Sequence, residues 1–292
     1  MLTQEQIAFY HEHGYLGVEN VLSENEVNNL RRITDEYVEK SREVTDHTEV
    51  FDLEPGHTPE NPKLRRLKSP ISLHEVYRKT LHHEKILGIV SQLIGYGLRC
   101  NGNKLNMKQP GYGSPVEWHQ DWAFYPHSND DLLAVGIVLD DMTEENGPLL
   151  VIPGSHKGPV YDHHLDGHFC GAVTDPTFSD KGAVPVMVKA GGITIHHVRM
   201  LHGSVSNTSD KPRRLLLFQY CAIDAYPLSG LNNWDLFNGT IVRGEPTNIP
   251  RVEAVPVRMP WPGALRSGSI YESQTVIKES KFSKEHYNTK RE

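Results

Sequence analysis

A histidine and an aspartate stand two residues apart in the segment Glu117-Trp118-His119-Gln120-Asp121. On an extended strand the side chains of His119 and Asp121 project from the same face, where both can bind one metal ion. A His-x-Asp pair is a weak signal by itself, because the chain contains 17 histidines and such pairs arise by chance. The pair therefore needs a third ligand before it indicates a metal site.

A third ligand and an anion-binding residue occur together downstream. The segment Leu201-His202-Gly203-Ser204 follows a β-like run, and Arg213 stands eleven positions after His202. Two imidazoles and one carboxylate on one face of iron(II) leave three positions open, enough for a bidentate 2-oxo acid and for dioxygen. A guanidinium pairs bidentately with a carboxylate, so Arg213 suits the distal carboxylate of 2-oxoglutarate. His196 and His197 are alternatives for the third ligand, because both lie close to His202 in the sequence.

Helices are expected near the beginning of the chain. Thr3 with Gln6, and Ser23 with Glu26, have the spacing of a capping box at a helix start. The second helix carries apolar residues at helical spacing, which predicts one buried stripe. The stripe consists of Val27, Leu30, Ile33, Tyr37 and Val38.

The pattern changes from helical to β-like at about residue 98. Before that point, residues 46–70 predict a long loop and residues 72–94 a third helical zone. After it, short apolar runs are separated by Gly, Pro, Asn and Asp, which is typical of an all-β sandwich or barrel. The predicted strands cover residues 104–109, 132–140, 149–152, 184–188, 193–197 and 214–223. No element is predicted after Pro227.

Composition limits the class of protein and its partners. A chain of 292 residues can bury one sizeable core, and its 23% charged and 37% hydrophobic residues are ordinary for a globular protein. The net charge of -7 argues against a nucleic-acid partner, and no apolar run is long enough to cross a membrane. Three unpaired cysteines and the lack of an apolar leader favour the cytoplasm. We therefore expect a small-molecule substrate; the sequence does not define the oligomeric state.

These segments together resemble the phytanoyl-CoA dioxygenase (PhyH) family of iron(II)/2-oxoglutarate oxygenases. The resemblance covers most of the chain and lies in Phe9–Leu16, His119–Asp121, Glu145–Leu149, Ile152–His156, His202–Ser204, Asn207 and Arg213. It implies a mainly β fold with flanking helices (α+β), a double-stranded β-helix of the jelly-roll, cupin-like type. It also implies one PhyH-like domain over residues 1–292, with a mostly helical part at 1–97, a β-helix core at 98–226 and an irregular extension at 227–292.

The resemblance also implies roles for individual residues. His119, Asp121 and His202 would be the iron ligands and thus the catalytic residues, with Arg213 and Ser204 on the distal carboxylate of 2-oxoglutarate.

Further pocket residues are expected from the strand before the metal segment. Lys108 or Asn106 could bind the cosubstrate, although the sequence leaves the face of this strand, which also carries Lys104, ambiguous. Some relatives have a tryptophan where this chain has Gly136, which predicts more room in the pocket.

Aromatic residues follow the metal segment directly. Trp122, Phe124 and Tyr125 predict a substrate wall, with core packing as the alternative. A local group of histidines is a second metal site or, more simply, a solvated loop. This group consists of His163, His164 and His168.

The expected function is hydroxylation or desaturation of an unactivated carbon in a small organic metabolite, with release of succinate and CO2. The cofactors would be Fe(II), 2-oxoglutarate and O2, with ascorbate as an additional reductant in vitro. Asp121 favours hydroxylation, because related halogenases carry a small residue at this position. The alternatives are an acyl-CoA hydroxylase of the same chemistry, a non-catalytic cupin-like binding protein, and a zinc or iron hydrolase.

Overall fold

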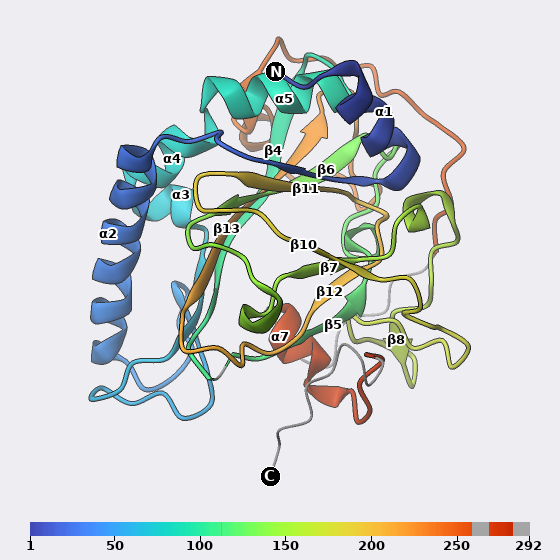
Figure 1. Cartoon of the computed structure of the whole chain (residues 1–292). Helices are drawn as coiled ribbons and strands as arrows, with labels where there is room; N and C mark the ends of the chain where they lie inside the picture. Colours follow the sequence, from blue (N-terminus) through green and yellow to red (C-terminus); the bar gives the residue numbers. More distant parts are fainter. Residues whose placement is uncertain (112, 259–268, 283–292) are drawn as a thin grey trace.

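The computed structural model describes residues 1–111, 113–258 and 269–282, and its two main sheets face each other (Figure 1). The larger sheet has the order β1-β11-β6-β13-β4-β3-β2, with β14 also paired to β4. Its strands are β1 (Tyr15–Val18), β2 (Phe51–Leu53), β3 (Leu64–Lys68), β4 (Leu98–Lys108), β6 (Leu132–Val138), β11 (Ile193–His197), β13 (Arg213–Ala222) and β14 (Ile241–Arg243). The smaller sheet, in the order β10-β7-β12-β5, consists of β5 (Val116–His119), β7 (Leu149–Val151), β10 (Val184–Val186) and β12 (His202–Ser204). A separate hairpin joins β8 (His164–Leu165) to β9 (His168–Phe169).

The first two helices begin where the sequence predicts them. The capping boxes at Thr3 and Ser23 are both present, and they start the first two helices. The helices are α1 (Gln4–His13), α2 (Glu24–Lys40), α3 (Pro70–Leu73), α4 (Glu75–Leu81), α5 (Glu84–Ile94), α6 (Trp234–Asn238) and α7 (Ile270–Ser273). Short 3-10 turns are η1 (Ser41–Glu43), η2 (Asp121–Ala123), η3 (Glu144–Asn146), η4 (Ser155–Lys157) and η5 (Gln274–Val276). No helix in the described ranges is long and apolar enough to span a membrane.

Alternation along β13 explains how one strand serves both the core and the cavity. Leu216, Phe218 and Tyr220 face outward and pack in one cluster with apolar residues of α2, α4 and α5. Leu215 and Leu217 face inward, because successive side chains of a strand point to opposite faces, and they pack toward the smaller sheet. The larger sheet therefore carries helices on its outer face, and its inner face lines the space between the two sheets.

Two regions differ from the sequence-based expectation. The loop predicted for residues 46–70 contains strands β2 and β3, because Leu64 and Leu67 are fully buried and β3 pairs with β4. The C-terminal extension contains α6, β14 and α7, although residues 259–268 and 283–292 lie outside the described ranges. Both regions owe their structure to pairing and packing with distant parts of the chain, which local periodicity does not record. The six predicted strands, in contrast, each overlap an observed strand.

Candidate active site

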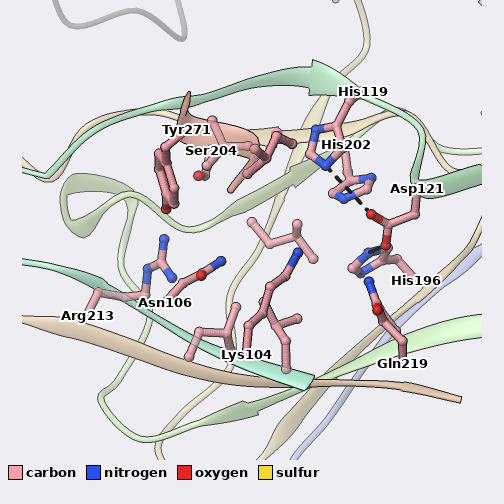
Figure 2. A pocket seen from close by; sticks show the side chains of 17 residues that line it. Lys104, Asn106, His119, Asp121, His196, His202, Ser204, Arg213, Gln219 and Tyr271 are labelled. Carbon is pink, nitrogen blue, oxygen red and sulfur yellow. Dashed lines mark ion pairs between the residues drawn. The ribbon is translucent and has the colours of Figure 1, made fainter. Parts of the chain in front are cut away.

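A cavity lies between the two sheets (Figure 2). Its volume is about 50 Å³, compared with roughly 10–15 Å³ for a single water molecule. Its lining comes from β4, β6, β11 and β13 of the larger sheet, from β5, β7 and β12 of the smaller sheet, and from the turn η2 and helix α7. Segments spread from Lys104 to Tyr271 therefore meet at one small cavity.

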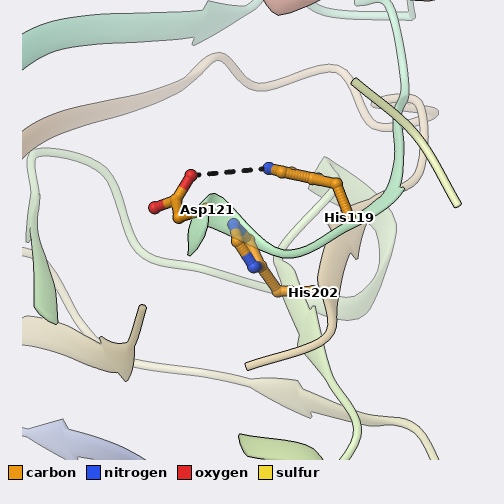
Figure 3. Close-up of side chains that lie close together, drawn as sticks. All are labelled: His119, Asp121 and His202. Carbon is orange, nitrogen blue, oxygen red and sulfur yellow. Dashed lines mark ion pairs between the residues drawn. The ribbon is translucent and has the colours of Figure 1, made fainter. Parts of the chain in front are cut away.

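Strand pairing brings the two predicted histidine ligands together. His119 ends β5, His202 begins β12, and the two are register partners across the antiparallel pair. Asp121 is the first residue of the turn η2, so the extended segment assumed from the sequence ends just before it. The Nε2 atom of His119 lies 3.8 Å from Oδ1 of Asp121, and one ligand atom from each of the three residues lies within 4.8 Å of the others (Figure 3).

Backbone carbonyls fix the tautomer of both histidines. The Nδ1 atom of His119 lies 2.8 Å from the Glu117 carbonyl oxygen, and Nδ1 of His202 lies 2.9 Å from that of Met200. A carbonyl can only accept, so each Nδ1–H donates and each Nε2 presents its lone pair. Burial lowers the pKa of His119 to about 4 and that of His202 well below its usual value. Both rings are therefore neutral at pH 7, as metal ligands must be.

The carboxylate between them is held ionised. Burial raises the pKa of Asp121, but the nearby His196 and His202 imidazoles and the charge of Lys104 outweigh this effect, so the pKa lies well below its usual value. Two neutral imidazoles and one carboxylate are a donor set that suits iron(II).

The neighbouring histidines occupy different positions. The Nε2 atom of His196 lies 3.6 Å from Oδ2 of Asp121, on the carboxylate oxygen opposite His119. His197 faces Asp130 at 3.9 Å instead. The geometry therefore favours His202 over His196 and His197 as the third ligand.

Arg213 is a buried cation without an anionic partner. Its side chain lines the cavity, only 3% of the residue is exposed, and Nε donates to the Gly147 carbonyl at 3.1 Å. Within the described part of the chain no carboxylate forms an ion pair with it, although burial lowers its pKa only to about 10. A buried charge without a partner is unfavourable, so this guanidinium is set up to receive an anion. Asn106 and Ser204 line the same end of the cavity (Figure 2).

Lys108 lies outside the cavity, unlike Asn106. Its Nζ donates to the carbonyl oxygens of Ser114 at 3.0 Å, Ser204 at 3.4 Å and Val205. Lys108 shares the inward side of β4 with Asn106 but lies at the strand end, where it supports the backbone around β12. Its contacts indicate a structural role, contrary to the expectation of a cosubstrate ligand.

The three aromatic residues after the metal segment separate into different roles. Trp122 is buried in a core cluster, and its indole donates to the Pro256 carbonyl at 2.7 Å. The ring of Phe124 packs edge-on against His119, with centroids 5.9 Å apart. The Tyr125 hydroxyl accepts a hydrogen bond of 2.7 Å from Gln219, which itself lines the cavity. Core packing thus accounts for Trp122, whereas Phe124 and Tyr125 stand directly behind residues of the site.

The room expected beside Gly136 is already filled. A Cβ atom at this position would lie 2.5 Å from Oγ1 of Thr194 and 2.9 Å from Cδ1 of Leu215. These two side chains take the space that a larger residue would occupy, so Gly136 does not enlarge the cavity.

The histidines at 163–168 do not form a metal site in the described ranges. His163 is buried, and its Nε2 accepts from the backbone amide of Gln120 at 2.9 Å while Nδ1 meets the Tyr161 carbonyl. The one group with metal-ligand geometry among the described residues is that of His119, Asp121 and His202.

Sequence reasoning missed several residues of the cavity wall. Gln219 stands six residues after Arg213, so the two-residue period of β13 would have placed it on the inward face. Ile270 and Tyr271 of α7 close the cavity from the C-terminal region. Their one sequence signal is the capping box of Ser269 and Glu272, in a segment without periodicity.

This arrangement, with two imidazoles, a carboxylate and an unpaired arginine between two facing sheets, is that of a non-haem iron(II), 2-oxoglutarate-dependent dioxygenase. The model of the phytanoyl-CoA dioxygenase (PhyH) family matches residues 10–215, and the chain belongs to this family.

Relatives and solved structures agree with this assignment. The chain is 37% identical to a protein of Stutzerimonas stutzeri named probable alpha-ketoglutarate-dependent hypophosphite dioxygenase, over 94% of this chain and 97% of that protein. It is 32% identical to the L-proline trans-4-hydroxylase of Streptomyces griseoviridis, over 75% of this chain and 86% of that protein. The crystal structure of EctD from S. alaskensis with bound iron superposes with a TM-score of 0.66 at 23% identity, covering 87% of this chain and 88% of that one. The predicted jelly-roll fold is therefore confirmed, and the protein is a dioxygenase that uses iron and 2-oxoglutarate (another name for alpha-ketoglutarate).

Proposed function

We propose that His119, Asp121 and His202 hold the iron, and that Arg213 and Ser204 hold the distal carboxylate of 2-oxoglutarate. The observation that carries this proposal is the buried, unpaired guanidinium of Arg213 in the same small cavity as the three ligand atoms. A structural arginine at 3% exposure would be expected to have an acidic partner. A dianionic cosubstrate that chelates the metal at one end supplies that partner at the other.

The cosubstrate site extends along the inward face of β4 and β13. Asn106 is the register partner of Leu215 and has a buried Oδ1 without a hydrogen-bond partner among the described residues. It lines the cavity beside Arg213, as does Tyr271, whose ring closes this end (Figure 2). We assign Asn106, in place of Lys108, to the cosubstrate pocket.

When bound, iron(II) and 2-oxoglutarate together activate dioxygen, so that one oxygen atom enters succinate as CO2 leaves and the other enters the substrate. The residues of the chain perform the positioning. His119 and His202 are locked by their carbonyl partners, so each Nε2 stays directed at the metal position. Leu215, Leu217 and Ile270 give the cavity an apolar wall that excludes water around the reacting atoms.

The substrate is a small molecule, because little of the cavity remains once the cosubstrate reaches Arg213. The relative named for hypophosphite matches almost the whole chain, so hypophosphite is the first compound to test, followed by L-proline. We further propose that the protein works in the cytoplasm and does not bind nucleic acid. In support, Cys100, Cys170 and Cys221 are buried and free, and the net charge is -7.

Turnover without substrate tests the site directly. Purified protein with iron(II), ascorbate and 2-oxoglutarate should slowly form succinate in the absence of any substrate. His119→Ala should abolish succinate formation, whereas Lys79→Met, which changes an exposed residue on α4, should not. Succinate formation that persists in His119→Ala would contradict the assignment of the metal ligands.

A further inference from the structure

Lys104 is a second cation of the cavity without a direct ion-pair partner among the described residues. It lies on β4, two residues before Asn106, and its ammonium points across the cavity toward the metal ligands (Figure 2). Among the described residues it forms neither an ion pair nor a hydrogen bond, and Asp121 lies beyond ion-pair distance. A lysine facing a mostly apolar cavity needs either a partner or a function, because an uncompensated charge is unfavourable there.

The charges around the cavity show what the partner must be. Three charged side chains line it, namely Asp121, Arg213 and Lys104, and the described residues add no other. With the proposed ligands bound, Asp121 and the chelating carboxylate of 2-oxoglutarate match the two charges of iron(II). The distal carboxylate matches Arg213. Lys104 alone is left with one unmatched positive charge.

Polar groups next to Lys104 can complete an anion site. His196 lines the cavity and is 2% exposed; its Nε2 faces Oδ2 of Asp121 at 3.6 Å, and its Nδ1 has no hydrogen-bond partner among the described residues. The amide of Gln219 also reaches the cavity and is steadied by its hydrogen bond to Tyr125. An N–H of each side chain can donate to the oxygens of a bound anion. Ala134 and Leu217 line the same cavity, whose volume of about 50 Å³ suits a small anion.

We propose that the substrate is a small anion carrying one negative charge, held beside the iron by Lys104 with His196 and Gln219. This inference rests on the proposed function, because it assumes that iron and 2-oxoglutarate occupy the rest of the cavity. It makes Lys104 the residue that determines specificity. It also disfavours the acyl-CoA alternative.

Anaerobic titration of the enzyme with iron(II) and 2-oxoglutarate tests the inference. The visible absorption band of the iron–cosubstrate complex is followed while hypophosphite, phosphite or acetate is added, with acetamide as the uncharged match for acetate. At least one anion should shift the band and stimulate succinate formation under air, and acetamide should do neither. No shift with any of the three anions would overturn the proposal.

Lys104→Met separates substrate binding from cosubstrate binding. It keeps the length of the side chain and removes the charge, so affinity for the anion should fall by at least about 30-fold. The KM for 2-oxoglutarate in substrate-free turnover should stay unchanged, and Lys79→Met should match the wild type throughout. If Lys104→Met instead raises the KM for 2-oxoglutarate, Lys104 belongs to the cosubstrate site and the inference is wrong. Failure of the proposed function has a different signature, since the wild type would then show no absorption band and no substrate-free succinate.

Discussion

His119 and His202 lie directly opposite each other on neighbouring antiparallel strands, and their ring centroids are 4.0 Å apart. Each ring is oriented by a carbonyl two residues earlier in its own strand or loop. The pairing of the two strands places the two Nε2 atoms side by side. Because the strand pairing builds the site, the metal position is preorganised by the fold.

Replacing either histidine should remove iron binding, whereas replacing His196 should only weaken it. We expect no measurable iron(II) binding for His202→Ala, and for His196→Gln a loss of at most about 100-fold, as for residues that support a metal ligand. The measurement is an anaerobic competition with a coloured chelator. Equal losses in the two variants would place His196 among the ligands and contradict the assignment made from the geometry.

Arg213→Met should weaken the binding of 2-oxoglutarate. Loss of a buried charge pair costs about 2–5 kcal/mol, so we expect the KM for 2-oxoglutarate to rise at least about 30-fold. Iron affinity should not change, because Arg213 lies at the far end of the cavity from Asp121 (Figure 2). Arg32→Met is the control, since Arg32 is an exposed residue of α2 paired with Glu36. A normal KM for 2-oxoglutarate in Arg213→Met would refute the assignment of the distal carboxylate.

Lys108→Met should reduce stability and leave the KM for 2-oxoglutarate unchanged. The substitution leaves the carbonyls of Ser114, Ser204 and Val205 without their donor. Each unsatisfied buried acceptor costs about 1–3 kcal/mol, offset in part by removal of a buried charge, so we expect a net loss of about 1–3 kcal/mol. Urea unfolding measures the loss. A raised KM for 2-oxoglutarate in a fully stable variant would restore Lys108 to the cosubstrate site.

The contrast between Lys104 and Lys108 shows what the sequence can and cannot predict about the site. Both have the same strand parity as Asn106, so periodicity alone places all three on one face. They differ in position along β4, where a rise of about 3.3 Å per residue separates the two lysines by roughly 13 Å. Which of them meets the metal depends on where β5 and β12 cross that strand. That crossing is set by the tertiary fold, and no local pattern encodes it.

Residues with strong local signals were predictable, in contrast. The capping box of Ser23 starts α2 where expected, and His119, Asp121, His202 and Arg213, singled out from the sequence, lie in one cavity. Tyr271 could not be assigned in this way, because it reaches the cavity from a short helix whose sequence has no clear periodicity.

Stability of the iron-free protein should fall as the pH drops below about 6.5. Burial lowers the pKa of His119 and His127 to about 4, and that of His163 and His197 to about 3. In the unfolded chain these residues return to a pKa near 6.5. Between these values the unfolded state binds more protons than the folded state, so the free energy of unfolding decreases as the pH falls. Each histidine contributes on the order of 1 kcal/mol per pH unit over this window.

Urea unfolding at pH 7.5, 6.5 and 5.5 would record this slope, because stability should change little between roughly pH 7.5 and 6.5 and fall between roughly pH 6.5 and 5.5. His163→Gln should make the slope shallower, because glutamine can accept from the Gln120 amide without taking up a proton. His168→Gln, at an exposed position on β9, is the matched control and should leave the slope as it is. A slope that is the same in all three proteins would mean that His163 is not held neutral by its burial.

Tyr271 should support binding of 2-oxoglutarate through its aromatic ring, not through its hydroxyl. The ring lies 4.5 Å from the Arg65 guanidinium and lines the cavity beside Arg213, while its hydroxyl has no hydrogen bond to any described residue. In Tyr271→Ala water gains access to the cosubstrate end, which weakens the charge pair formed there. We expect the KM for 2-oxoglutarate to rise about tenfold, equivalent to about 1.4 kcal/mol of binding, while Tyr271→Phe stays close to the wild type. Equal effects of the two substitutions would show that the hydroxyl itself contacts the cosubstrate, and Tyr271 would then join Arg213 and Ser204 as a ligand of the distal carboxylate.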